Sequence, residues 1–199
     1  MISLNILCRA PQPGFSKTRL IPLLGADGAA RAQISLLHHV VAVTRSWCEK
    51  RSNRLFRLWY TPQSSVSFFQ ELAPQEWLRL QPEGDLGARL DYVVRQGLRE
   101  ATAVMVIGGL TPYRNQPRQA VLAPAADGGY VLVGLHEVPS DLFEDIPWGS
   151  FDVARVTRDR FLKHGMAWQE LEGHWDVDTP TDWQRFQKML TMKDKSPIF

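Results

Sequence analysis

Short apolar runs bounded by turn residues recur along the chain and predict buried strands. The clearest is Ala103–Ile107, AVMVI, which ends at Gly108-Gly109. A second apolar run, Tyr130–Leu135, follows the turn at Pro124–Gly129. The same pattern predicts further strands over 2–8, 54–60, 77–80 and 120–123, and a weak strand near 167–171.

Between these runs, apolar residues recur every three or four positions, which is typical of helices with one buried face. Ala30, Ile34, Leu37 and Val41 share such a face in a helix predicted over about 26–50. Other helices are predicted over 85–101, 151–164 and 181–190. Alternating strands and helices indicate an α/β fold: a three-layer αβα sandwich with a mostly parallel sheet. We expect a single domain over 1–192 and a frayed tail over 193–199.

In such sheets, ligands bind beyond the carboxyl ends of the strands. The loop after the first strand, the Gly108-Gly109 turn and the Pro124–Gly129 turn all belong to that edge. We therefore expect the functional residues to lie in these loops.

Composition narrows the class of protein. The 199 residues are 44% hydrophobic and 22% charged, which is ordinary for a soluble globular protein. No apolar run approaches the roughly 20 residues that cross a bilayer, and the N-terminus reads as a strand rather than a signal peptide. Cys8 and Cys48 have no motif spacing and indicate free thiols in a reducing compartment. We expect a cytoplasmic protein with no membrane span.

Charge is unevenly distributed along the chain. Residues 1–60 hold nine Lys/Arg against two Asp/Glu, although the net charge of the chain is only +2. This asymmetry suits a cleft that takes phosphate on one side and a cation on the other. The alternative is that the basic residues between 45 and 57 only solvate a helix end and the next strand. No contiguous basic stripe with interleaved aromatics is present, so we expect no nucleic-acid binding.

The loop Arg9–Leu20, RAPQPGFSKTRL, resembles a phosphate loop but matches neither common motif. A P-loop needs Gly directly before the Lys, where this chain has Ser16. A Rossmann fingerprint needs several glycines, whereas Gly14 is the only one in the loop. Lys17 and Arg19, with Arg9 at the end of the strand, would still bind phosphate by charge-assisted hydrogen bonds. The alternative is an exposed loop whose cations pair with nearby acids.

Asp176-Val-Asp178 offers a candidate metal site. In extended backbone, alternate side chains share a face, so the two carboxylates would present oxygen ligands to Mg²⁺ or Mn²⁺. Thr179-Pro180-Thr181-Asp182 follows as a helix start, so one acid of the pair would serve the helix N-terminus instead. We expect metal ligation by Asp176 or Asp178, or by both.

Five segments together resemble a known family: PQPGFSKTRLIPLLG (11–25), LQPEGDLGARL (80–90), VLAPAADGGYVLVGL (121–135), PWGS (147–150) and DVDTPTDW (176–183). In this order they are similar to the radical-SAM/selenodomain-associated transferases, which are glycosyltransferase-like. These resemble in turn the GT-A nucleotide-diphospho-sugar transferases and nucleotidyltransferases, including 2-phospho-lactate guanylyltransferases. The resemblance implies a GT-A-like fold over nearly the whole chain.

The resemblance also implies roles for individual residues. Lys17 and Arg19 would bind the nucleotide phosphates. The base would be read by Gln81, Leu86 and Gly87.

On the acceptor side, the resemblance makes Asp127 a candidate catalytic base or hydroxyl ligand. Gly128 and Gly129 permit the close approach of a ligand. The alternative for Asp127 is an Asx-turn that only shapes the bend. Trp148 is either a core residue or an aromatic floor for the acceptor.

One departure from the resemblance concerns the turn after the 103–107 strand. The family pattern there reads I-G-x-D-C-P, whereas this chain reads Val106-Ile-Gly-Gly-Leu-Thr-Pro-Tyr113. No Asp or Glu occurs between Ala101 and Ala126. Metal binding would then depend on Asp176 and Asp178 alone, and activity would be weakened or lost.

The leading hypothesis is a nucleotide-dependent transferase, for glycosyl or nucleotidyl transfer. It would use Mg²⁺ or Mn²⁺, a nucleotide or nucleotide-sugar donor and a small-molecule acceptor. The alternative is a non-catalytic nucleotide- or partner-binding module that has lost the metal-binding Asp. A weaker third hypothesis, a structural interaction protein, predicts no cleft where the loop, the DGG turn and the DVD segment converge.

Overall fold

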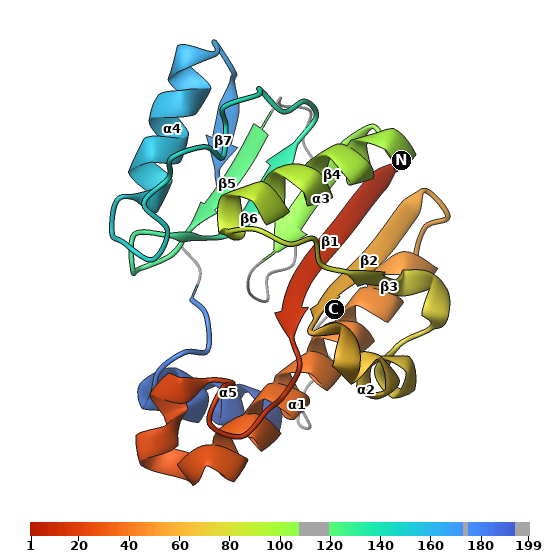
Figure 1. Cartoon of the computed structure of the whole chain (residues 1–199), viewed down its shortest axis with the longest axis vertical. Helices are drawn as coiled ribbons and strands as arrows, with labels where there is room; N and C mark the ends of the chain where they lie inside the picture. Colours follow the sequence, from red (N-terminus) through yellow and green to blue (C-terminus); the bar gives the residue numbers. More distant parts are fainter. Residues whose placement is uncertain (108–119, 173–174, 194–199) are drawn as a thin grey trace.

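A mixed sheet of seven strands forms the centre of the computed structural model, which describes residues 1–107, 120–172 and 175–193 (Figure 1). The order across the sheet is β3-β2-β1-β4-β6-β5-β7. Only β6 runs antiparallel to its neighbours, so the described sheet is mostly parallel, as the sequence predicted. The strands are β1 Ile2–Arg9, β2 Arg54–Thr61, β3 Leu78–Leu80, β4 Ala103–Ile107, β5 Ala120–Pro124, β6 Tyr130–Leu135 and β7 Trp168–Glu170.

Helices cover both faces of this sheet and confirm the α/β sandwich. Side chains of α1 and α2 pack on one face with Leu4, Ile6 and Phe56, while α3 and α4 pack on the other with Val104 and Val106. The α-helices are α1 Ile21–Glu49, α2 Val66–Leu72, α3 Leu86–Glu100, α4 Val153–Lys163 and α5 Pro180–Lys193. Short 3₁₀ turns precede α1 (η1, Thr18–Leu20), α2 (η2, Gln63–Ser65) and β3 (η3, Gln75–Trp77).

A third, smaller cluster lies beyond the arrowhead of β1, where α5 packs on the first half of α1 (Figure 1). Its centre is made of Leu20, Leu36, Trp183 and Phe186, together with Val177 from the segment before α5. Because the carboxyl end of β1 faces this cluster, the chain around Val177 is brought to the edge of the sheet where ligands bind in α/β folds.

The predicted element boundaries are close to the observed ones, with two informative differences. Helix α1 begins at Ile21 rather than near residue 26, but Gly25 carries a non-helical φ of 69° that divides the first turn from the main helix. Helix α2 was not predicted, because its seven residues span only two turns and show too little periodicity.

Helix α5 extends to Lys193, beyond its predicted end near 190. Residues 194–199 and the Gly108–Gln119 stretch lie outside the described residues, so the single domain over 1–192 and the tail stay predictions.

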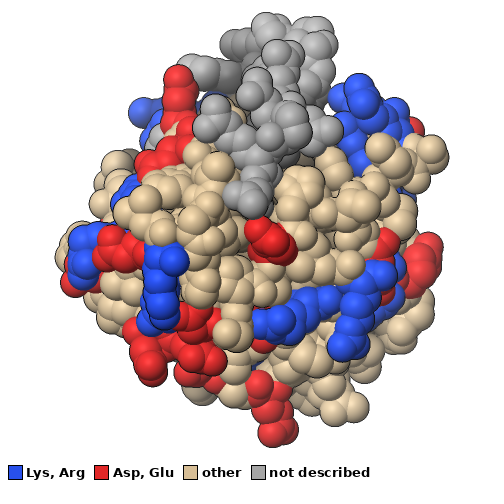
Figure 2. All heavy atoms as spheres, turned by 90° about the horizontal axis from the view of Figure 1, so that it is seen from above, with Lys and Arg blue, Asp and Glu red and all other residues tan. Residues whose placement is uncertain are grey.

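The surface seen from above the view of Figure 1, on the side where β1 begins, mixes both signs of charge (Figure 2). Lys and Arg side chains alternate there with Asp and Glu, and neutral residues separate them. Ion pairs such as Arg57–Glu100 and Arg158–Glu170 join oppositely charged side chains. None of the described helices is long and apolar enough to span a bilayer.

Candidate functional site

The loop after β1 is held in shape by its own residues. The buried Ser16 hydroxyl donates to the Ala10 carbonyl at 2.8 Å and accepts from the Gln12 amide at 2.8 Å. Gly14 has φ 80° and Lys17 has φ 46°, a left-handed conformation that is uncommon for a residue with a side chain. These turns reverse the chain into η1 and direct the Lys17 side chain toward the segment before α5.

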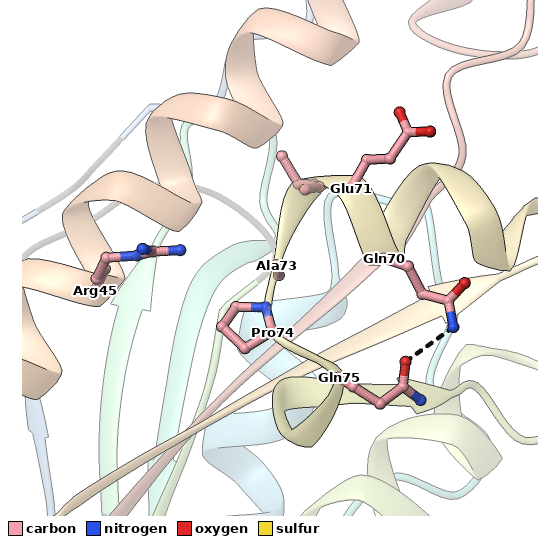
Figure 3. Close-up of a pocket in the computed structure, with 7 residues that line it drawn as sticks. Arg45, Gln70, Glu71, Ala73, Pro74 and Gln75 are labelled. Atoms are coloured by element: carbon pink, nitrogen blue, oxygen red, sulfur yellow. Dashed lines mark hydrogen bonds between the residues drawn. The ribbon is translucent and has the colours of Figure 1, made fainter.

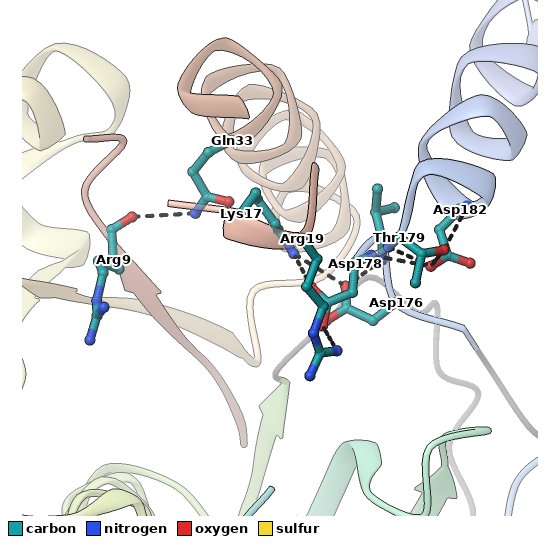
Figure 4. A network of polar contacts seen from close by, with 9 residues as sticks. Arg9, Lys17, Arg19, Gln33, Asp176, Asp178, Thr179 and Asp182 are labelled. Carbon is teal, nitrogen blue, oxygen red and sulfur yellow. Dashed lines mark hydrogen bonds and ion pairs between the residues drawn. The ribbon is translucent and has the colours of Figure 1, made fainter. Parts of the chain in front are cut away.

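Lys17 and Arg19 meet the two acids of the DVD segment (Figure 4). The Lys17 ammonium lies 2.9 Å from Asp178 Oδ1 and 3.9 Å from Asp176 Oδ1. One Arg19 guanidinium nitrogen lies 3.3 Å from Asp178 Oδ2. The residues predicted to bind phosphate and those predicted to bind metal therefore form one network. The same ion pairs are those expected under the alternative prediction, in which the loop cations only pair with nearby acids.

The start of α5 positions Asp178. Asp182 Oδ2 accepts from the Thr179 amide at 2.8 Å and from the Thr179 hydroxyl at 2.6 Å. The Thr179 hydroxyl oxygen in turn lies 3.3 Å from the Asp182 amide, which completes a reciprocal cap of the helix N-terminus. Asp182 is thus the structural acid of this segment, and it holds the backbone that carries Asp178.

Asp176 lies between a cation and two further acids. Burial raises its pKa above the usual range, and the charge of Lys17 is the strongest effect opposing that shift. The charges of Asp178 and Asp127 raise the pKa further, while the hydrogen bond from the Val177 amide lowers it. Asp127, on the β5–β6 turn, is therefore close enough to act on Asp176 electrostatically. A divalent cation would relieve this repulsion.

Within the described residues, no group of three or more His, Cys, Asp or Glu side chains is arranged to hold a metal. Asp176 and Asp178 would supply only part of a metal shell. Mg²⁺ is commonly held by one or two carboxylates plus substrate phosphates and water, so the pair fits a metal that arrives with a phosphorylated ligand.

The Asp127 turn has the geometry of an Asx-turn, because Asp127 Oδ1 accepts from the Gly129 amide at 3.1 Å. Gly128 has φ 83°, and a Cβ there would lie 2.2 Å from the Phe151 carbonyl oxygen. Its own carbonyl accepts from the Ala154 amide at 2.8 Å, which joins the turn to the start of α4. The carboxylate is exposed, so the turn is compatible with both predicted roles of Asp127.

The residues predicted to read the base differ in their surroundings. Gln81 donates both hydrogens of its side-chain amide to main-chain carbonyls, at 2.8 Å to Cys8 and 2.9 Å to Trp59. Leu86, at the start of α3, is 45% exposed. Of these residues, only Leu86 presents a free surface to a ligand.

Gly87 and Trp148 come together in the structure. A Cβ on Gly87 would lie 2.4 Å from the Phe143 carbonyl oxygen and 3.1 Å from the Trp148 indole nitrogen. Trp148 is partly buried and packs edge-on against the ring of Tyr130, 6.3 Å between centroids. The absence of a side chain at Gly87 lets the start of α3 pack closely against Phe143 and Trp148. Trp148 therefore resembles a core residue more than an open aromatic floor for an acceptor.

Arg9 lies apart from the Lys17–Asp178 network (Figure 4). Its carbonyl accepts from the Gln33 side-chain amide at 3.3 Å, and its side chain is exposed. The structure therefore does not place Arg9 in one phosphate-binding site with Lys17 and Arg19.

A shallow, open depression of about 450 Å³ lies elsewhere, between α1 and the chain after α2 (Figure 3). It contains none of the residues predicted to be functional. Its walls are Arg45, Gln70, Glu71, Leu72, Ala73, Pro74 and Gln75.

The sequence did not indicate the roles of Ser16 and Arg89. Ser16 counted only as a mismatch to the P-loop, although Ser or Thr in such a loop commonly bonds to local backbone. Arg89 stands in the quoted segment LQPEGDLGARL and donates to the Gln81 side-chain oxygen at 3.4 Å. A single basic residue on a helix carries no sequence signal for this contact.

Comparison with known proteins identifies the family of this chain. The family model described as "Uncharacterized protein conserved in bacteria (DUF2064)" matches residues 46–150, which is more than half of the chain. The chain belongs to this family. The matched range runs from β2 to β6 and includes Gln81, Gly87 and Asp127, whereas Lys17 and Asp178 lie outside it. A search of curated proteins finds no match.

A solved structure supports the fold. A proposed nucleotide-diphospho-sugar transferase from Desulfovibrio desulfuricans G20 is similar with a TM-score of 0.78 and 24% identity, covering 98% of this chain and 89% of that one. This likeness confirms the α/β fold with its mostly parallel sheet. The Rv0371C protein from Mycobacterium tuberculosis H37Rv, crystallised with manganese, is more distant, with a TM-score of 0.40 and 17% identity over 94% of this chain and 98% of that one.

Proposed function

We propose that this protein is a nucleotide-dependent transferase for glycosyl or nucleotidyl transfer. Its donor is a nucleotide or nucleotide-sugar, bound with Mg²⁺ or Mn²⁺, and its acceptor is a small molecule. The family to which the chain belongs has no stated activity. The resemblance to the radical-SAM/selenodomain-associated transferases is therefore part of this proposal.

The observation that carries the proposal is the meeting of Lys17 and Arg19 with Asp176 and Asp178 beside the carboxyl end of β1. Two cations and two carboxylates balance one another while no ligand is bound. A metal–diphosphate complex is likewise close to neutral. When the complex binds, its phosphates would pair with Lys17 and Arg19, and its metal ion would be coordinated by Asp176 and Asp178. Every charged group would then still have a partner of opposite charge.

The Arg19–Asp178 ion pair is weak enough for this exchange, whereas Lys17, at 17% exposed, is better shielded from water. Arg19 and Asp178 are well exposed, and exposed ion pairs contribute only about 0–1 kcal/mol. Hydrogen bonds from charged groups to phosphate are worth about 1.5–3 kcal/mol each. Phosphate would therefore displace Asp178 from Arg19 at small cost, while Lys17 would exchange a carboxylate partner for a phosphate oxygen. Both cations would stabilise charge on the leaving group. Asp127 would orient or deprotonate the acceptor.

A second candidate function is a non-catalytic nucleotide-binding module. It is favoured by one observation, the absence of Asp and Glu between Ala101 and Ala126 in a position where related transferases carry a metal ligand. Such a module would bind nucleotide without any metal.

Thermal unfolding with nucleoside diphosphates and nucleotide-sugars, with and without Mg²⁺ or Mn²⁺, tests the proposal. A ligand at 100 times its Kd adds about 2.7 kcal/mol of stability, or roughly 5–10 °C in Tm for a chain of this size. We expect the Lys17→Ala/Arg19→Ala variant to lose this shift. The Arg31→Ala/Arg99→Ala variant removes the same charge elsewhere and should keep it.

Three outcomes separate the candidates. An equal shift in both double variants would contradict phosphate binding by the loop. A shift that EDTA leaves unchanged, together with no product from any donor, would favour the non-catalytic module. Loss of the metal-dependent part in Asp178→Asn would support metal ligation.

A further inference from the structure

Two guanidinium groups near the carboxyl ends of β1 and β3 have no acidic partner among the residues that the structure describes. Arg9 is the last residue of β1, and Arg89 lies in the first turns of α3, shortly after β3. Within the described residues, neither forms an ion pair, and Arg89 makes one long hydrogen bond, to Gln81. Their surroundings therefore differ from those of Lys17 and Arg19, which are both paired.

Arg89 is held in place with donors to spare. It is partly buried, and its Nε is shielded from solvent without a hydrogen-bond partner in the described part of the chain. A guanidinium carries five N–H donors and no acceptor. The Nε itself is out of a ligand's reach, but a single bond to Gln81 leaves terminal N–H donors of the guanidinium for a ligand that offers only acceptor atoms.

Gln81 orients Arg89 rather than competing with it. The Gln81 amide nitrogen is committed to the carbonyls of Cys8 and Trp59, which leaves its oxygen facing Arg89 at 3.4 Å. The Gln81 main-chain amide also donates to the Tyr60 carbonyl at 2.9 Å. Gln81 thus ties together the ends of β1, β2 and β3 and holds the Arg89 side chain above them.

Arg9 projects to the same side of the sheet as Arg89. Cys8 packs with the α1 and α2 side chains, and Leu7 packs with those of α3. Because successive strand residues point to opposite faces, Arg9 shares the α3 face with Leu7. Among the nearby acids, Asp85 is engaged as the N-cap of α3, where it accepts from the Ala88 amide at 2.8 Å.

We propose that Arg9 and Arg89 form a second oxyanion-binding site, distinct from the Lys17–Arg19 loop. It binds a phosphate or carboxylate group, because guanidinium groups match the planar, acceptor-only faces of these anions. Which substrate carries that group depends on the proposed function: either the nucleotide donor or an acidic acceptor. The existence of the site does not depend on it.

Inorganic phosphate is the probe for a direct test. Titration calorimetry is carried out in the Lys17→Ala/Arg19→Ala background, so that phosphate on the loop does not mask the second site. We expect Arg9→Met and Arg89→Met each to weaken phosphate binding about tenfold or more, since each removes charge-assisted hydrogen bonds. Arg89→Lys, which keeps the charge but not the fork of donors, should restore part of the affinity.

Arg95→Met is the matched control, because Arg95 is on the same helix and pairs with Asp91. It should bind phosphate like its parent. Equal affinity in the parent, Arg9→Met and Arg89→Met variants would overturn the proposal. If Arg89→Met does not fold, Arg9→Met decides, since the exposed Arg9 side chain carries no packing role.

Two further measurements in the otherwise unchanged protein identify the substrate. Weaker binding of a nucleoside diphosphate in Arg89→Met assigns the anion to the donor. Arg89-dependent binding of phosphate to protein already saturated with the nucleoside diphosphate assigns it to the acceptor. If no nucleotide binds, the proposed function fails, while the phosphate titration still reports on the Arg9–Arg89 site.

Discussion

At the residue scale, Asp178 joins parts of the chain that are 161 positions apart. Its two oxygens contact Lys17 and Arg19, so one carboxylate serves both cations of the loop. The sequence pattern indicated phosphate binding for the cations and metal binding for the acid. The structure brings both sets of residues into one network of ion pairs, so under the proposed function each set would stand in for the ligand of the other.

Gly128 is the residue whose identity the turn between β5 and β6 most strictly requires. Its φ is 83°, and an added Cβ would lie 2.2–2.5 Å from the backbone of Phe151. We expect Gly128→Ala to destabilise the protein by roughly 2–4 kcal/mol, because left-handed strain and a backbone clash add together. Chemical denaturation measures the free energy of unfolding.

Gly149→Ala separates the two causes. Gly149 has φ 84°, but nothing lies within 4 Å of its added Cβ. Its substitution should therefore cost only the strain, about 1 kcal/mol. Equal losses in the two variants would mean that contact with Phe151 does not constrain the turn.

At the element scale, the carboxyl end of α4 is tied to the chain before it through Asp141. The Asp141 carboxylate lies 2.5 Å from Lys163 Nζ, 2.5 Å from His164 Nε2 and 3.1 Å from Arg160. The hydrogen bond from Lys163, followed by that from His164, holds the pKa of Asp141 well below its usual range against the opposing effect of burial. The ionised form is thus favoured in the folded protein.

This lowered pKa predicts a pH dependence. An unfolded Asp titrates near pH 3.9, so the stabilisation is fully present above about pH 4 and is lost as the pH falls below that value. We expect the Tm of wild type to fall more steeply than that of Asp141→Asn below about pH 4. Asp159→Asn, which removes an exposed acid of the same helix, should follow wild type. Parallel curves for wild type and Asp141→Asn would refute the role of Asp141.

At the scale of the whole molecule, α5 completes the candidate site. It packs on the first half of α1 and on the segment of Val177, which lies between the two acids. The site is therefore assembled from the beginning and the end of the chain, while the family match covers the middle.

Phe186→Ala tests this dependence on α5. Phe186 is 1% exposed and contacts the rings of Trp183 and His39, with centroids 5.7 and 5.5 Å away. We expect a loss of about 3–5 kcal/mol, faster amide exchange in α5, and weaker nucleotide binding although no binding residue is changed. Phe15→Ala, at a side chain that is 70% exposed, should leave stability unchanged. Slow exchange retained in α5 of Phe186→Ala would contradict the role of this cluster.

The sequence alone determined the strands and most helices of the described chain. Runs such as Ala103–Ile107 and the spacing of Leu90, Val93 and Val94 are local patterns, and each follows from burying one face of an element. The fold class followed because alternating strands and helices have few ways to bury those faces. Helix α2 was missed because so short an element depends on its tertiary contacts.

Only the tertiary structure decided which candidate residues come together. Lys17 faces Asp178 and Gly87 faces Trp148 through contacts between elements distant in sequence, and Arg89 faces Gln81 across the turn between β3 and α3. Such contacts depend on how helices and loops pack at the strand ends, and they leave no periodic trace in the chain. The sequence therefore supplied the chemical groups. Packing determined that Lys17 and Arg19 pair with an acid, and that Arg9 and Arg89 are available to the anion we propose.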